Sequence, residues 1–233
     1  MGRVIIALDF PRGDEALNLV DDIGEAGTFY KVGLQLYTAE GPRVVQALKD
    51  RGKRVFLDLK LHDIPNTVAG GVRVASQLGV DFLTLHTVGG GAMLEAARDA
   101  AGETRLLGVT VLTSLGAVDL EVTWGRKSPS VAEEVGRLAD LAVQHRIHGV
   151  VVSPHEASSI RSRVGAEFLV VTPGIRPAGV ERDDQQRVAT PAAAIAAGAD
   201  YLVVGRSITR ASEPEAALYS ILTEVDLANS NDG

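Results

Sequence analysis

Residues 56–67, with the sequence FLDLKLHDIPNT, carry three charged side chains within and just after an apolar run. Asp58 and Lys60 are two residues apart, so in a β-strand they point to the same face, and Asp63 follows just beyond the expected strand end. Charged side chains are seldom fully buried unless they are paired. One interpretation is a structural ion pair next to a capped helix. The clustering of Asp58, Lys60 and Asp63 favours an active site, because charged groups that shift one another's pKa are typical of catalytic centres.

Other polar side chains are expected at the same end of the neighbouring strands. In a barrel of parallel strands the active site lies at the carboxyl ends of the strands. Besides Asp58 and Lys60, the polar residues that fall at or just after predicted strand ends are Asp9, Lys31, His86, Thr113, Arg176 and Arg206. We therefore expect these side chains to converge on one mouth of the fold.

Gly205 and Arg206 stand where the last predicted strand meets its helix. Barrels of this kind often bind a phosphate group at that position, through backbone N–H groups and a helix N-terminus. An arginine adds a forked donor that suits phosphate oxygens. The alternative is a glycine turn with a solvated arginine, but Arg176 on the neighbouring loop favours phosphate binding.

We expect no metal centre. No histidines or carboxylates have the close spacing of metal ligands, and although Asp9 and Asp58 might share a metal in space, Lys31 and Lys60 compete for the same volume as cations. His86 is a possible base, yet a lone histidine at a strand end is more often hydrogen-bonded structure, and we favour that interpretation.

The elements that position these residues alternate between strands and helices along the chain. Apolar runs predict eight strands. Seven are at residues 3–9, 28–33, 81–86, 105–112, 149–153, 167–172 and 201–204, and the third strand of the chain runs from residue 56 to just before Asp63. Helical spacing predicts helices within 13–27 and at 41–50, 66–78, 92–100, 131–145, after residue 154, and at 191–197 and 213–226. Two long loops, 113–130 with Trp124 and 173–187, are expected to be functional.

This alternation predicts an α/β fold, a (β/α)8 TIM barrel, rather than a doubly wound sheet. No break in composition divides the 233 residues, so we expect one domain over residues 1–233 with a polar C-terminal tail from about residue 227.

Composition excludes several classes of protein. The net charge is −7 and no basic run is present, which argues against nucleic acid and anionic membrane surfaces as partners. The absence of cysteine rules out disulfides and thiolate metal sites. No stretch approaches the roughly 18 apolar residues that a membrane span requires. A cytoplasmic protein that binds a small molecule is therefore expected.

With these residues in view, the sequence resembles the orotidine 5'-phosphate decarboxylases of the bacterial type. The matching motifs are ALD at 7–9, KVG at 31–33, FLDLKLHDIPNT at 56–67, VTVLTS at 109–114, VTPGIRP at 171–177, DQ at 184–185 and VGRSIT at 204–209. They occur in order over nearly the whole chain. The resemblance implies decarboxylation of orotidine 5'-monophosphate to uridine 5'-monophosphate in de novo pyrimidine biosynthesis, without a cofactor.

The resemblance also implies roles for individual residues. Lys60 is expected to protonate C6 of the pyrimidine within an alternating array of Lys31, Asp58, Lys60 and Asp63. The active unit is expected to be a homodimer with shared active sites, in which Asp63, Ile64 and Thr67 reach the site of the neighbouring chain.

Substrate contacts are implied in the same way. Asp9 and Lys31 are expected to bind ribose hydroxyls with Thr67 of the neighbouring chain. Thr113 and Ser114 are expected at the pyrimidine edge. The phosphate is expected to be bound by Arg176, Gly205, Arg206 and Gln185, with Gln186 as the alternative glutamine.

Two other functions stay open at this stage. A Mg²⁺-dependent 3-keto-L-gulonate 6-phosphate decarboxylase or hexulose phosphate synthase shares the Asp-x-Lys-x-x-Asp element, but such relatives have an acidic residue in place of Lys31. A barrel that only binds a nucleotide has no use for the charged array.

Overall fold

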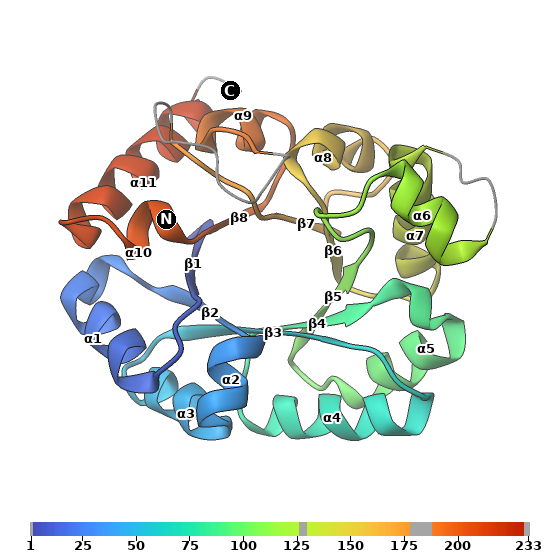
Figure 1. Ribbon diagram of the computed structural model, residues 1–233, viewed down its shortest axis with the longest axis horizontal. Helices are drawn as coiled ribbons and strands as arrows, with labels where there is room; N and C mark the ends of the chain where they lie inside the picture. The colour runs from blue at the N-terminus through green and yellow to red at the C-terminus, as the bar shows by residue number, and fades with distance from the viewer. Residues whose placement is uncertain (1, 126–129, 178–187, 231–233) are drawn as a thin grey trace.

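The computed structural model of the chain describes residues 2–125, 130–177 and 188–230. Within these residues eight parallel strands form a closed barrel in chain order, with helices around it (Figure 1). The strands are β1 (Val4–Leu8), β2 (Phe29–Gly33), β3 (Arg54–Leu61), β4 (Phe82–His86), β5 (Arg105–Val109), β6 (Gly149–Val151), β7 (Leu169–Thr172) and β8 (Tyr201–Val204). The predicted (β/α)8 TIM barrel is confirmed.

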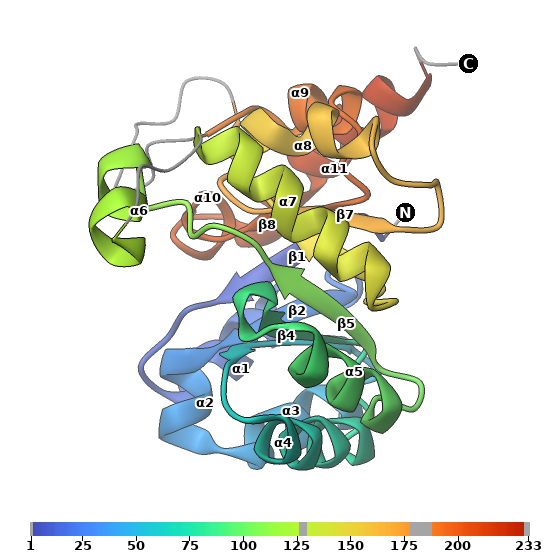
Figure 2. The same ribbon diagram turned by 90° about the vertical axis from the view of Figure 1, so that its right-hand side faces the viewer.

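The helices form the outer layer. They are α1 (Gly13–Ile23), α2 (Leu34–Glu40), α3 (Pro42–Asp50), α4 (Pro65–Gln77), α5 (Gly91–Ala100), α6 (Ala117–Trp124), α7 (Val131–Gln144), α8 (Pro154–Arg161), α9 (Pro191–Ala196), α10 (Arg206–Thr209) and α11 (Pro214–Ser230), with short 3-10 helices η1 (Gly24–Ala26) and η2 (Thr87–Gly89). In Figure 2 the arrow of β5 points toward the end of the barrel at which α6 lies.

The interior of the barrel is apolar and aromatic toward the amino ends of the strands. Phe29 and Phe82, each the first residue of its strand, lie with ring centroids 5.1 Å apart, and Phe56 lies 5.9 Å from Phe82. The Arg54 guanidinium lies 4.0 Å from the centroid of Phe29 and pairs with Asp81 at 2.9 Å. Aromatic rings and the ion pair of Arg54 with Asp81 thus fill the amino end of the barrel.

The strand residues that alternate with these pack outward against the helices. Ile6, Leu8, Leu57 and Leu83 are buried there in a second, larger apolar cluster. Burial on both faces explains why the strands read as near-continuous apolar runs in the sequence.

Three helices were not predicted. The segment after β2 forms α2 and α3 in succession, because Gly41 adopts a φ of 62° and Pro42 starts a new helix without an N–H group to satisfy. The insertion after β5 contains α6, whose Gly116 N–H donates to Asp119 Oδ2 at 2.8 Å. The four-residue α10 follows β8 directly. Each is too short to give a clear periodic signal.

Predicted and observed boundaries differ at the ends of several elements, among them α11 and β5. Helix α11 continues to Ser230, four residues beyond the predicted end at residue 226, and the buried side chains of Leu218, Ile221 and Val225 anchor it. Strand β5 ends at Val109 rather than near 112, and the chain then turns toward the mouth of the barrel.

Candidate active site

A cavity of about 250 Å³ opens at the carboxyl ends of the strands. The polar residues that line it are Asp9, Lys31, Asp58, Lys60, Thr113, Arg176 and Arg206, together with Gly174 and Gly205. Apolar side chains such as Phe56, Val109, Val151 and Val203 form its floor and walls. The expected convergence on one mouth is confirmed for all of the strand-end residues except His86.

Alternating charges run along one side of this cavity. Lys31 Nζ lies 2.9 Å from Asp9 Oδ1 and 3.7 Å from Asp58 Oδ2. Lys60 Nζ in turn donates to both oxygens of Asp58, at 2.8 and 2.9 Å. Asp9, Lys31, Asp58 and Lys60 thus form one continuous array that is contributed by β3, by β2 and by the residue after β1.

Asp58 is the most constrained acid of the array. Its side chain is 14% exposed and lies between two ammonium groups. Burial alone would raise its pKa, but Lys31, Lys60 and the hydrogen bond from Thr84 outweigh burial and hold the pKa of Asp58 below its usual range. Asp58 is therefore an anion at neutral pH, and the array is an alternation of fixed charges.

Local backbone geometry makes these contacts. At Gly33 an added Cβ would lie 2.9 Å from Lys31 Nζ and 3.0 Å from Asp9 Oδ1, so a larger residue there would displace the ends of these two side chains. In β3 the pairing with β4 shifts register between Leu57 and Leu61, and Lys60 has a φ of 51°. As predicted, the side chains of Asp58 and Lys60 meet on one face of β3, but the strand is bulged there and not regular.

Thr84 is a member of the site that the sequence analysis missed. It is fully buried on β4, accepts a hydrogen bond from the Lys60 N–H and donates one to Asp58 Oδ1, both at 2.9 Å. The sequence feature that could have revealed Thr84 is its hydroxyl, which stands alone in the apolar strand FLTLH on the same face as Phe82.

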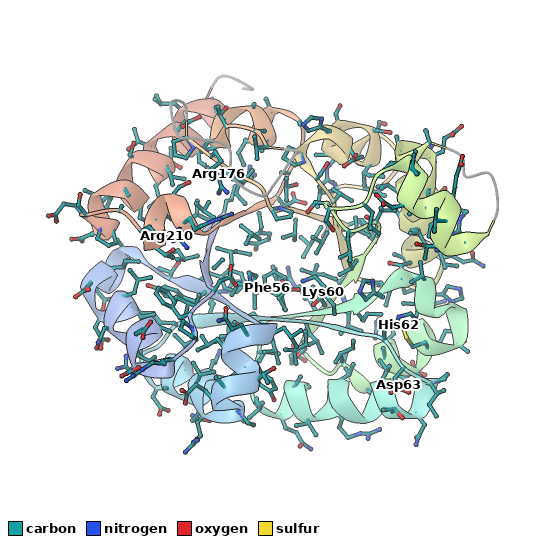
Figure 3. All side chains as sticks on the ribbon, in the orientation of Figure 1. Phe56, Lys60, His62, Asp63, Arg176 and Arg210 are labelled. Carbon is teal, nitrogen blue, oxygen red and sulfur yellow. The ribbon has the colours of Figure 1, made fainter. Side chains whose placement is uncertain are left out.

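Asp63 does not join the array of its own chain. Its side chain is exposed, and its Oδ1 accepts a hydrogen bond from the N–H of the next residue, Ile64, at 2.6 Å. Figure 3 shows Lys60 within the ring of strands, whereas Asp63 lies at the rim beside α4. Ile64 is 67% exposed, and Thr67 is exposed as well. Neither lines the cavity.

Two arginines, Arg176 and Arg206, line the cavity together with the array. Arg176, 8% exposed, follows β7, and Figure 3 shows it on the opposite side of the ring from Lys60. Its N–H donates to Ala189 O at 2.9 Å, which joins the two described ends of the long loop after β7. Arg206 begins α10 directly after Gly205, as the sequence indicated.

The remaining predicted contacts are distributed differently. Thr113 lines the cavity, whereas Ser114 is exposed and does not. Gln185 and Gln186 lie outside the described residues.

His86 lies beside the array without lining the cavity. Its ring centroid is 5.5 Å from that of His62. Burial, together with His62 and Lys60, lowers the pKa of His86 below its ordinary value. The side chain makes no hydrogen bond to a described residue, so the expected hydrogen-bonded role is not seen there.

The structure describes the possible metal ligands of residues 2–125, 130–177 and 188–230. No group of three or more His, Asp or Glu side chains in these ranges is arranged to hold a metal ion. The two carboxylates that face the cavity are each paired with a lysine.

Known proteins resemble this chain over almost its full length. Orotidine 5'-phosphate decarboxylases from Alkalilimnicola ehrlichii and Halorhodospira halophila are 51% and 50% identical to it, over 96% and 97% of this chain and 96% and 97% of the relatives. The one from Moorella thermoacetica is 47% identical over 97% of this chain and 92% of the relative.

A solved structure shows the same fold. The orotidine 5'-phosphate decarboxylase from Lactobacillus acidophilus superposes with a TM-score of 0.86 at 38% identity, covering 96% of this chain and 98% of that one. Residues 2–221 match the family described as "Orotidine 5'-phosphate decarboxylase / HUMPS family". The charged array at the mouth of the barrel thus stands in a chain that belongs to the orotidine 5'-phosphate decarboxylase / HUMPS family.

Proposed function

We propose that this chain decarboxylates orotidine 5'-monophosphate to uridine 5'-monophosphate in de novo pyrimidine biosynthesis, without a metal or cofactor. The observation that carries the proposal is the array Asp9, Lys31, Asp58 and Lys60 in the same cavity as Arg176 and Arg206. The array supplies fixed charges for the reaction, and the two arginines supply cations for a phosphate.

The chemistry requires a cation next to the reacting carbon. When the bond from C6 to the carboxylate breaks, CO2 leaves and the electron pair stays on C6, a carbon without a conventional electron sink. A preorganised ammonium group stabilises this developing charge far better than water, because it need not reorient during the reaction. Lys60 supplies that charge and then donates a proton from Nζ to C6; solvent restores the proton to Lys60.

Asp58 keeps Lys60 in place for this step. Both carboxylate oxygens of Asp58 accept from Lys60 Nζ, so the ammonium group is held on the cavity side of β3. Asp58 and Lys31 are the further catalytic groups of the proposal, since their charges surround the position of the reacting carboxylate.

The substrate is bound by the groups around the array. Asp9 and Lys31, paired at 2.9 Å, suit two neighbouring ribose hydroxyls, because one accepts and the other donates hydrogen bonds. Thr113 lies where the pyrimidine edge would be, with Ser114 adjacent in sequence. The phosphate is assigned to Gly205, Arg206 and Arg176, and Gln185 remains a proposed further ligand.

Phosphate binding also contributes to the reaction. The phosphate is remote from C6, so its binding energy can order the segment around Arg176 and exclude water from the reacting bond. Two observations support a role of this segment in phosphate binding: the Arg176 side chain is buried, and the neighbouring Ile175 forms a β-bridge with Ala189.

We propose a homodimer with shared active sites as the active unit. Asp63, Ile64 and Thr67 are exposed at the start of α4 and do not reach the cavity of their own chain. Ile64 is 67% and Val74 53% exposed on the same segment, which gives an apolar surface for a second copy. In the dimer Asp63 would extend the partner's array, and Thr67 would assist ribose binding.

We also propose that the chain forms a single barrel domain, acts in the cytoplasm, and binds neither nucleic acid nor membrane. The net charge of −7 supports the last two points. Among the helices of the described residues, none is both long enough and apolar enough to cross a bilayer.

A Mg²⁺-dependent sugar-phosphate reaction on the same scaffold is disfavoured by Lys31. Its Nζ lies 2.9 Å from Asp9 and 3.7 Å from Asp58, in the volume that a shared Mg²⁺ would need.

The test is turnover of orotidine 5'-monophosphate by the purified chain, followed by the change in pyrimidine absorbance with and without a chelator. Formation of uridine 5'-monophosphate in both conditions is expected. A folded protein that converts no substrate, or one that requires added Mg²⁺, would show that the proposal is wrong.

A further inference from the structure

The bulge in β3 places Lys60 in an unfavourable backbone conformation. Paired residues are Leu57 with Leu83 and then Leu61 with Leu85, so β3 advances four residues while β4 advances two. Within this bulge Lys60 has a φ of 51°, in the left-handed region that residues other than glycine seldom adopt. Such a conformation persists only where the surroundings fix it, and it is concentrated at functional sites.

The Thr84 hydroxyl is the group that fixes it. Thr84 Oγ1 accepts the Lys60 N–H at 2.9 Å, so this N–H is satisfied within the bulge by a side chain of β4. The same oxygen lies 2.9 Å from Asp58 Oδ1. An ionised carboxylate can only accept hydrogen bonds, so the single hydroxyl proton is directed to Asp58 and a lone pair is left for Lys60.

These bonds close a ring around Lys60. Thr84 connects the Lys60 N–H to Asp58, and Asp58 accepts from the ammonium group of the same lysine at 2.8 and 2.9 Å. The Lys60 side chain is 38% exposed and intrinsically mobile, so without the ring its ammonium group could leave the cavity for solvent. Thr84 itself is fully buried, and among the described residues its hydroxyl bonds only to Lys60 N–H and Asp58 Oδ1.

We propose that Thr84 is a positioning residue for the decarboxylation, which sets Asp58 and the backbone of Lys60 so that the Lys60 ammonium group is held at C6. This inference rests on the proposed function. Thr84 does not line the cavity, so it acts through the two catalytic groups and not on the substrate.

The experiment compares kcat and KM for Thr84→Val, Thr84→Ser and a matched control, Thr104→Val. Thr104 is also buried, donates to Val80 O at 2.9 Å, and precedes β5 at the amino end of the barrel. Thr84→Val is expected to lower kcat by roughly 10²-fold, as for a reacting group displaced by about 1 Å, with KM nearly unchanged. Thr84→Ser restores both hydrogen bonds and should restore kcat. Thr104→Val should lower thermal stability and leave kcat intact.

The pH profile gives a second readout. Loss of a hydrogen bond to ionised Asp58 raises its pKa, so the acid limb of kcat should move to higher pH in Thr84→Val. The other charged or titratable groups around Asp58 are Lys31 and Asp9, Lys60, and His86 on β4, and all are retained.

The outcomes separate the inference from the function on which it rests. Wild-type protein that converts no substrate refutes the proposed function. Active wild type with a Thr84→Val variant of unchanged kcat, or a Thr84→Ser variant as slow as Thr84→Val, overturns the role of the hydroxyl. If Thr84→Val does not fold, Thr84→Ala is measured in its place against the same expectations.

Discussion

Complementation between two inactive variants tests whether Asp63 serves the partner's site. Lys60 donates to Asp58 in its own chain, whereas Asp63 is exposed at the rim. Lys60→Ala leaves Asp58 paired with Lys31 at 3.7 Å and bonded to Thr84, and Asp63→Ala removes an exposed side chain, so both variants should fold. Each homodimer should lose roughly 10²–10³-fold in kcat, since one charged group is missing from every site.

The magnitude of recovery follows from counting sites. In a heterodimer of the two variants, one site holds Lys60 of one chain and Asp63 of the other, and the second site holds neither. Random exchange of equal amounts makes about half of the dimers heterodimeric, each with one intact site of two, so about a quarter of wild-type activity should return.

The assay is turnover after subunit exchange, with heterodimers quantified by native mass spectrometry. The matched control mixes Lys60→Ala with Asp58→Ala; both residues act within one chain, so no site becomes intact and no recovery is expected. If Lys60→Ala and Asp63→Ala form heterodimers without recovering activity, the shared-site reasoning is refuted, while the decarboxylase function is untouched.

Three further predictions concern the phosphate, metal dependence and stability. Arg206→Ala should lower kcat/KM by roughly 10²–10⁴-fold, because two charged hydrogen bonds to the phosphate contribute about 1.5–3 kcal/mol each. If the wild type converted the nucleoside, which lacks the phosphate, as fast as the nucleotide, the assignment of Arg206 to the phosphate would be contradicted. Exhaustive chelation should leave kcat unchanged, and restoration of lost activity by Mg²⁺ would contradict the cofactor-free reaction. Burial, together with Arg98 and Arg105, lowers the pKa of His148, so below about pH 6.5 the unfolded chain binds more protons than the folded one. The free energy of unfolding should therefore fall as the pH decreases below this value. In His148→Asn the curve of Tm against pH should be flatter, and a curve identical to that of the wild type would show that His148 is not the cause.

Much of the site could be predicted because the barrel topology brings strand ends together. Asp9 follows β1, and Lys31 and Asp58 lie within β2 and β3, so knowing these successive strands was enough to place the three side chains at one mouth. The meeting of Asp58 and Lys60 followed from a period of two, although a bulge lies between them.

Contacts that depend on a neighbouring strand could not be read from the sequence. Thr84 meets Asp58 and Lys60 only because the β3 bulge is paired with β4, and a lone threonine in an apolar strand does not reveal its partner. Gly33 has the same limitation, since its lack of a side chain matters only beside the pair formed by Lys31 and Asp9. Helices α2, α6 and α10 were missed because a few residues carry little periodic signal.

The central claim is that Lys60 delivers a proton to C6, and turnover in D2O tests it most directly. The measurement is turnover of orotidine 5'-monophosphate in D2O by wild type and Lys60→Ala, both treated with chelator, with the product identified by NMR and mass spectrometry. The proposed mechanism predicts uridine 5'-monophosphate carrying one deuterium at C6 from the wild type, and product formation slowed by roughly 10²–10³-fold in Lys60→Ala. A folded, dimeric wild type that releases no uridine 5'-monophosphate, or a Lys60→Ala variant that forms it at the wild-type rate, would contradict the account.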